Sequence, residues 1–305
     1  MTFAARFLVS PDLFPARNAG EPWGTASIVI GLPGGPYRID GLSSAQHHAL
    51  AERFRPVLVD DDAGSLVTRT FRYPEAEFTK FDKTGWEYTL DVDRRGPSIA
   101  LAGIDFVARL SGHPPGEGAL FVCVDGTAPD LRRYLGAVEN SLRVAVALRA
   151  VGSRAVVLHS AALVKNGRAH LFVGHSGAGK STLSRFGHAE GARVLSDDMN
   201  FLRVTTEGAF LERLPFTGDF HVPTASPEAF PLAGVYRLEQ AAEDGLRPLG
   251  RAETLGLLAS SAPFINEDPF RSGDLMDTLA DVAAAVEGHA LAFTRSGAFW
   301  KLLAS

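Results

Sequence analysis

The stretch LFVGHSGAGKSTLSRF, residues 171–186, constrains the fold of this chain more than any other part of the sequence. Residues 174–181 follow the pattern G-x-x-x-x-G-K-[ST], with an apolar run before the pattern and a helix-forming run after it. Glycines let the backbone of such a loop curl inward, so that consecutive N–H groups point at phosphate oxygens beside a helix N-terminus. The sequence therefore predicts a strand, a phosphate-binding loop and a helix in direct succession.

The residue types in this loop indicate a nucleoside triphosphate bound with a metal ion. Lys180 places an ammonium group at the β and γ phosphates, and Ser181 offers a hydroxyl to Mg²⁺. We expect ATP and Mg²⁺ as the cofactors. The predicted nucleotide-binding residues are Gly174, His175, Ser176, Gly177, Ala178, Gly179, Lys180, Ser181 and Thr182.

Two adjacent carboxylates, Asp197 and Asp198 in the segment LSDD, follow Lys180 by 17 and 18 residues. A helix and a returning strand in that interval would bring both carboxylates beside the phosphates. One of them could then hold Mg²⁺, and the other could accept a proton from an attacking hydroxyl. The alternative is a solvated Asp-Asp turn that caps the next segment.

A histidine, His159, stands 21 residues before Lys180 on an otherwise apolar strand. A lone histidine in such a strand is commonly a packed core residue. An imidazole near a carboxylate and a γ-phosphate can also tune a base or stabilise transferred charge. Spacing alone leaves both interpretations open.

The composition is that of an ordinary globular chain of 305 residues, long enough for two domains. A net charge of −5 without a block of like charge argues against nucleic acid or a membrane surface as the main partner. The single cysteine, Cys123, excludes an intrachain disulfide and a cysteine-based zinc site. We expect a cytoplasmic protein, because the N-terminus lacks a signal-peptide pattern and no uncharged apolar span reaches membrane-crossing length.

The pattern of apolar residues and turn signals divides the chain into three parts. Short strands and turn signals over residues 1–125 predict a small α+β accessory or substrate-positioning domain, with a loop at residues 112–118. Apolar residues at helical spacing in residues 126–150 predict a connecting amphipathic helix. Residues 151–305 are predicted to form the ATP-binding domain, with a β-hairpin turning at Asn166-Gly167 just before the loop.

Three segments together, LHSAALV, LFVGHSGAGKSTLS and RVLSDDMNFL, resemble the catalytic domain of the HPr kinase/phosphorylase family. They are more distantly similar to ATP-dependent phosphoenolpyruvate carboxykinase. The resemblance covers roughly residues 150–300. It implies a mixed α/β fold, with a P-loop kinase domain of this type preceded by the small α+β domain.

The active site of these families combines a histidine on the strand before the loop, the loop itself and an Asp-Asp pair after its helix. The matching residues here are His159, Lys180, Ser181, Asp197 and Asp198. The resemblance implies that Asp198 accepts the proton of the substrate hydroxyl and that Asp197 lies on the magnesium side. It also implies a catalytic role for His159 and Lys180.

A further acidic metal ligand of the family lies in a Leu-Glu-x-Arg-Gly signature. The segment FLERLPFTGDF offers Glu212 and, further on, Asp219, but its Arg-Gly portion is altered. Glu212 is therefore a predicted metal ligand by resemblance, beside Ser181 and Asp197.

The predicted activity is ATP-dependent transfer of the γ-phosphoryl group to a hydroxyl, foremost a serine of a protein or peptide. Two alternatives remain: a small-molecule kinase of the same fold, and an ATP-binding regulator without an acceptor. The resemblance also implies a homo-oligomer. The chain carries no LSGGQ-like signature, which argues against a transport ATPase.

Overall fold

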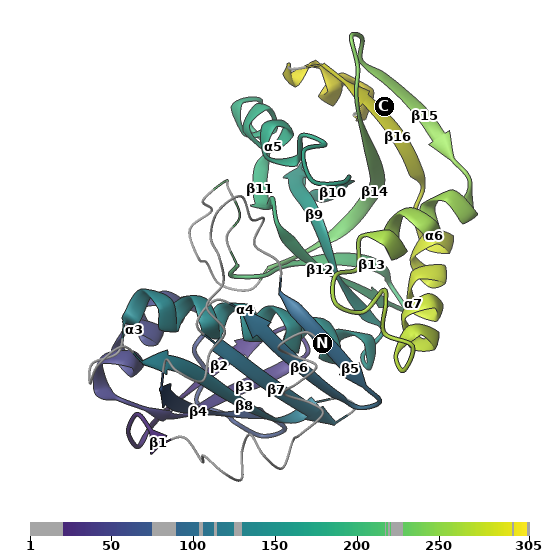
Figure 1. Ribbon diagram of the computed structural model, residues 1–305. Helices are drawn as coiled ribbons and strands as arrows, with labels where there is room; N and C mark the ends of the chain where they lie inside the picture. Colours follow the sequence, from purple (N-terminus) through teal and green to yellow (C-terminus); the bar gives the residue numbers. More distant parts are fainter. Residues whose placement is uncertain are drawn as a thin grey trace. The chain divides into compact units, whose positions relative to one another are not determined.

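The chain folds into two compact units, residues 1–149 and 150–305, in the computed structural model. Each unit is a mixed α/β structure built around strands that run both parallel and antiparallel (Figure 1). Within the described part of the chain, no helix combines the length and the apolar character needed to cross a membrane. The structure describes residues 21–74, 90–103, 106–112, 115–124, 130–216, 218, 220, 228–294 and 296–303.

The first unit is an eight-stranded sheet with the order β2-β3-β4-β8-β7-β6-β5, and β1 pairs with β4. Strands β3, β4 and β8 run parallel to one another, and the remaining pairs are antiparallel. The strands are β1 Glu21–Pro22, β2 Ala26–Leu32, β3 Gly35–Leu42, β4 Leu66–Pro74, β5 Asp91–Arg95, β6 Ser98–Gly103, β7 Phe106–Gly112 and β8 Pro115–Val124.

The helices of the first unit are α3 Ser44–Phe54, a 3-10 turn Arg55–Val57, and α4 Leu131–Val151. Helix α4 lies where the amphipathic helix was predicted, and its last two residues belong to the second unit. Ser43 caps α3, because its hydroxyl accepts from Gln46 N while Gln46 Oε1 accepts from Ser43 N. An ion pair between Arg53 and Glu139 joins α3 to α4.

The prediction of a loop at residues 112–118 is wrong for residues 115–118. Residues Pro115–Gly118 open β8, where Gly112 pairs with Pro115 and Ser111 pairs with Glu117. Proline is tolerated as the first residue of a strand because little ladder bonding is lost there. Neighbouring strands β4 and β7 then pair with β8 on both sides, which outweighs the low strand propensity of its glycines.

The second unit takes its shape from two long strands, β9 and β14, which each change partners midway. The first half of β9 pairs with β12 up to His159, and the second half pairs with β10 from Ser160 onward. Similarly, β14 pairs first with β13 and then with β10 and β16. The strands are β9 Ala155–Lys165, β10 Arg168–Val173, β11 Arg193–Ser196, β12 Met199–Thr205, β13 Gly208–Arg213, β14 Ala229–Gln240, β15 Gly245–Leu249 and β16 Gly288–Phe293.

Strands β9 and β10 form the predicted hairpin, and its turn residues Asn166 and Gly167 have φ values of 53° and 74°. Such left-handed values at both positions are typical of the tight turns favoured by Asn-Gly. Strand β10 therefore enters the glycine-rich loop with its register set by a local turn. The helices are α5 Lys180–Ala189, α6 Arg251–Ser260, α7 Ser272–Ala285, the 3-10 turn Gly297–Phe299, and α8 Trp300–Leu303.

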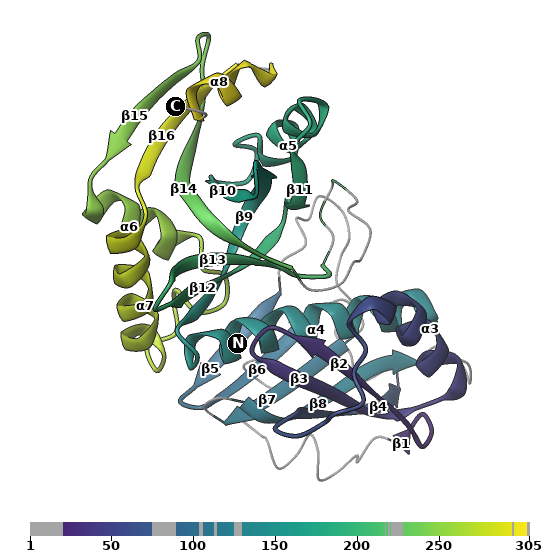
Figure 2. The same ribbon diagram turned by 180° about the vertical axis from the view of Figure 1, so that it is seen from behind.

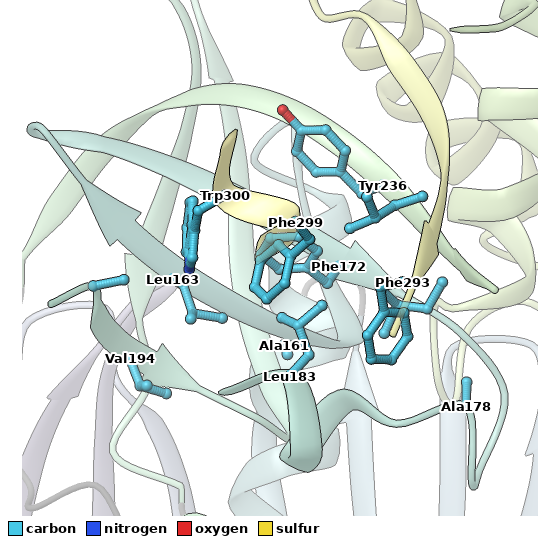
Figure 3. Packing of buried hydrophobic residues seen from close by; sticks show 13 residues of the cluster. Ala161, Leu163, Phe172, Ala178, Leu183, Val194, Tyr236, Phe293, Phe299 and Trp300 are labelled. Atoms are coloured by element: carbon cyan, nitrogen blue, oxygen red, sulfur yellow. The ribbon is translucent and has the colours of Figure 1, made fainter. Parts of the chain in front are cut away.

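Buried apolar side chains anchor the glycine-rich loop and α5 to the sheet. Leu183 of α5 is fully buried and joins a cluster that includes Phe172 of β10 and Phe293 of β16 (Figure 3). Ala178, within the loop itself, belongs to the same cluster. Burying a large apolar side chain stabilises a fold by roughly 1.5–3 kcal/mol, so the loop is fixed by the core beneath it. The view from behind shows α5 beside β9, β10 and β11 (Figure 2).

Candidate functional site

The glycine-rich loop, residues 174–181, needs glycine at three positions, because of backbone conformation, close packing or both. Gly177 and Gly179 have φ values of +79° and +103°, which residues with a Cβ rarely adopt. A Cβ at Gly179 would also lie 2.8 Å from Phe293 Cζ, and a Cβ at Gly174 would lie 2.6 Å from the Cβ of Ala178. The loop is thus curled tightly between β10 and α5, as the pattern predicts.

Lys180, the first residue of α5, is turned into this loop. The side chain is buried, and Nζ donates to the carbonyl oxygens of Gly174 at 2.8 Å and His175 at 3.2 Å. Burial lowers the pKa of Lys180 below its usual value, and the carboxylates of Asp198 and Asp197 offset part of this effect. An ammonium group held inside the loop in this way is placed to neutralise a bound phosphate.

The Asp-Asp pair lies on a turn between β11 and β12. Ser196 Oγ accepts from the backbone N–H groups of Asp198 at 3.1 Å and Met199 at 3.2 Å, which turns the chain sharply after β11. The carbonyl oxygen of Asp198 accepts from Ser160 N at 3.0 Å, so the turn is fixed to β9 at the residue where that strand changes partners. Asn200 Nδ2 donates to the carbonyl oxygen of Ser160 at 2.8 Å and completes the connection.

Asp197 is 4% exposed, and its two oxygens differ. Oδ2 accepts from Phe220 N at 2.9 Å, whereas Oδ1 is buried without a hydrogen-bond partner among the residues described. Gly218 passes so close that a Cβ there would lie 2.4 Å from Oδ1. A buried carboxylate oxygen without a donor needs a cation or a water, and this donor chemistry suits Mg²⁺.

His159 is the one exposed side chain along residues 155–164, where every other residue is buried. Its backbone pairs with Met199, next to the Asp-Asp turn, and its Nε2 lies 4.0 Å from Oδ1 of Asp198. The side chains of His159 and Asp198 are 47% and 23% exposed, so both reach solvent. The packed-core interpretation of His159 is therefore wrong, because the strand turns this imidazole out of the core toward the carboxylate.

These groups line one cavity of about 560 Å³ within the second unit. A cavity of that volume suits a small-molecule ligand such as a nucleotide. The predicted residues in its lining are His159, Ser176, Gly177, Gly179, Lys180, Ser181, Thr182, Asp197 and Asp198. Of the other loop residues, Ala178 is buried in the core, while Gly174 and His175 line a neighbouring cavity.

Five residues in this lining were not identified from the sequence: Arg185, Gly218, Gln240, Ala241 and Phe293. Gln240 Nε2 donates to the carbonyl oxygen of Gly177 at 2.9 Å and holds the tip of the loop. Arg185 lies one helical turn beyond Thr182 on α5, a spacing that alone could have indicated it. Gln240 and Phe293 reach the site from distant strands and leave no local signal.

Glu212 does not line this cavity among the described residues. It lies on β13 and forms an ion pair with Arg203 of the adjacent strand β12. Its role as a metal ligand stays a prediction, and Asp219 lies outside the described residues. Within the described ranges, no three His, Cys, Asp or Glu side chains gather as a metal site. A magnesium ion at a nucleotide takes several of its ligands from phosphates and water.

Comparison with known proteins adds little to this geometry. No protein-family model matches the chain, and no curated protein matches it in sequence. The solved structure of the Hpr(Ser) kinase/phosphatase from Coxiella burnetii is similar over 48% of this chain and 91% of that one. The TM-score is 0.29 at 12% sequence identity. A likeness at this level carries no argument, so the function is argued from the site.

Proposed function

We propose that this protein is an ATP-dependent kinase that transfers the γ-phosphoryl group to a hydroxyl, with a serine of a protein or peptide as the acceptor. One observation carries the proposal. A single cavity combines a buried lysine inside a glycine-rich loop, a carboxylate oxygen with no donor among the described residues, and an exposed histidine 4.0 Å from a second carboxylate. Phosphate binding alone would need only the first of these groups.

In this proposal, the loop N–H groups and Lys180 bind the phosphates of ATP. Ser181 and Asp197 would hold Mg²⁺, which neutralises phosphate charge when bound. Asp198 accepts the proton of the acceptor hydroxyl as the new oxygen–phosphorus bond forms. The bond between the γ-phosphorus and its bridging oxygen breaks, and ADP leaves with that oxygen.

The nearby imidazole supports the choice of Asp198 as the proton acceptor. His159 Nε2 lies 4.0 Å from Oδ1 of Asp198, so the imidazole can orient this carboxylate toward the acceptor hydroxyl through one bridging water. Asp197 is less suited to this role because it is 4% exposed and one oxygen already accepts from Phe220 N. The two carboxylates therefore divide the work, one toward the metal and one toward the acceptor.

The test is incubation of the full chain with γ-labelled ATP and Mg²⁺, together with cell extract and peptides encoded beside its gene. Mass spectrometry then identifies which molecule gains phosphate, and on which atom. We expect labelled serine. Lys180→Ala should abolish transfer, and Asp198→Asn should retain ATP binding while transfer falls by about 10²–10⁴-fold.

The outcome that contradicts the proposal is equally specific. If Asp198→Asn transfers phosphate at the parent rate, Asp198 is not the base. If ATP binds tightly and no molecule gains phosphate, the protein is an ATP-binding regulator. Label on a metabolite in place of a peptide would indicate a small-molecule kinase.

A further inference from the structure

A second cavity, of about 370 Å³, shares His159 with the first. Its walls are the start of the glycine-rich loop, strand β14 and the end of α6, all within the second unit. The polar side chains in its lining are His159, His175, Arg237, Ser260 and Ser261. Because His159 also lies beside Asp198, this cavity opens next to the proposed base.

The position of this cavity relative to the base is fixed by backbone contacts. His159 N donates to the carbonyl oxygen of Ser261 at 2.8 Å, which holds the end of α6 against β9. Lys180 Nζ donates to the carbonyl oxygens of Gly174 and His175, which holds the opposite wall. Lys180 therefore lines the first cavity and also hydrogen-bonds to the loop residues that form a wall of the second cavity.

Among the described residues of the lining, the fixed charge is the positive one of Arg237. The ionisable side chains of the lining are two histidines and Arg237, and no carboxylate is among the described residues that line the cavity. Arg237 donates to Oε1 of Glu239 through Nε at 3.0 Å and Nη2 at 2.7 Å. Both partners are about a third or more exposed, and exposed pairs of this kind contribute little, so Arg237 can turn to another anion.

The remaining lining restricts the size and shape of an occupant. Leu257 and other apolar side chains cover much of the wall. Ser260 and Ser261 donate their hydroxyl protons to the carbonyl oxygen of Leu257 at 2.9 Å and 2.8 Å, which leaves their oxygens as acceptors. A group that enters this cavity can place an anion at Arg237 and donate an N–H to a serine oxygen.

We propose that this second cavity binds the acceptor, and that the acceptor carries a carboxylate close to the hydroxyl that receives the phosphoryl group. Arg237 binds the carboxylate, and the hydroxyl faces Asp198. A guanidinium matches a planar carboxylate with two parallel hydrogen bonds. A single negative charge also suits a subsite beside Glu239 and the phosphates of ATP better than a doubly charged group would. This inference rests on the proposed phosphoryl transfer.

Two probes test the inference: N-acetyl-L-serine and N-acetyl-L-serinamide, which share the hydroxyl and differ in one charge. Each is incubated with the full chain, ATP and Mg²⁺, and the phosphorylated product is measured by mass spectrometry. We expect kcat/KM for the carboxylate probe to exceed that for the amide by about tenfold or more, as a charge-assisted hydrogen bond would supply. Arg237→Gln should raise KM for the carboxylate probe and leave KM for the amide unchanged.

The matched control is Glu239→Gln, which removes the partner of Arg237 and should keep or increase the preference for the carboxylate. A purely structural role for Arg237 would change KM for both probes alike. Equal use of the two probes, use of neither, or an unchanged preference in Arg237→Gln would overturn the inference. Failure of the kinase proposal is distinguishable, because then no acceptor of any kind gains phosphate from ATP.

Discussion

Gly179 tests the geometry of the loop most directly, through its replacement by alanine. The φ of +103° costs an alanine roughly 1–2 kcal/mol from backbone strain alone. The new Cβ would also lie 2.8 Å from Phe293 Cζ, and this ring cannot give way easily because it is 3% exposed in the core. Overpacking of this kind costs about 1–3 kcal/mol. The two effects together predict a loss of about 2–5 kcal/mol in the free energy of unfolding.

Gly177→Ala is the matched control, because Gly177 has a φ of +79° but open space where its Cβ would stand. It should lose only the backbone cost, roughly 1–2 kcal/mol. Urea unfolding of both variants, followed by circular dichroism, measures the difference. ATP binding should follow the same order, since a shift of the loop at Gly179 turns its N–H groups away from the phosphates.

Phe293→Leu separates the two contributions at Gly179. Leucine lacks Cζ, so Gly179→Ala should cost less in the Phe293→Leu background than in the parent, by about 1 kcal/mol or more. Equal costs in both backgrounds, or equal effects of Gly177→Ala and Gly179→Ala, would refute the argument that Phe293 constrains the loop.

Three further predictions concern the second unit. Asp197→Asn should raise the Mg²⁺ concentration for half-maximal ADP formation by about 10-fold or more. An unchanged Mg²⁺ requirement would show that Asp197 does not face the metal. Burial lowers the pKa of His170 from 6.5 to about 4, so the folded state favours the neutral ring. The contribution of His170 to stability is full above pH 6.5 and falls by about 3 kcal/mol toward pH 4. In urea titrations over this range, His170→Phe should therefore lose less stability than the parent. Asn166→Ala, at φ 53°, should lose about 1 kcal/mol in the same assay, whereas Asn166→Gly should not.

Local sequence predicted the elements whose contacts are near in the chain. Asn166 with Gly167 turns the β9–β10 hairpin, because these two residues adopt their φ values without distant partners. The segment at residues 112–118 failed for the opposite reason. Its pairing with β4 joins Glu117 to Val67, which is distant in the chain, and no local pattern reports this contact.

Part of the candidate site likewise follows from local sequence, and part of it does not. The order of loop, helix and Asp-Asp pair follows from spacing, since a loop leading into α5 and a return along β11 leaves few places for Asp197 and Asp198. The second cavity does not follow from spacing. It needs Arg237 from β14 and the end of α6, which only tertiary packing brings beside His159.

By itself, the sequence determined a strand, a glycine-rich loop and a helix, with two carboxylates after the helix and a histidine before the strand. These features are local because glycine φ angles, caps and tight turns depend on near neighbours. Only the tertiary structure decided that His159 faces Asp198. The direction of this side chain depends on strand pairing, because β9 pairs with β12 up to His159 and with β10 from Ser160 onward. Such register is set by pairing between distant segments, which a local pattern does not report.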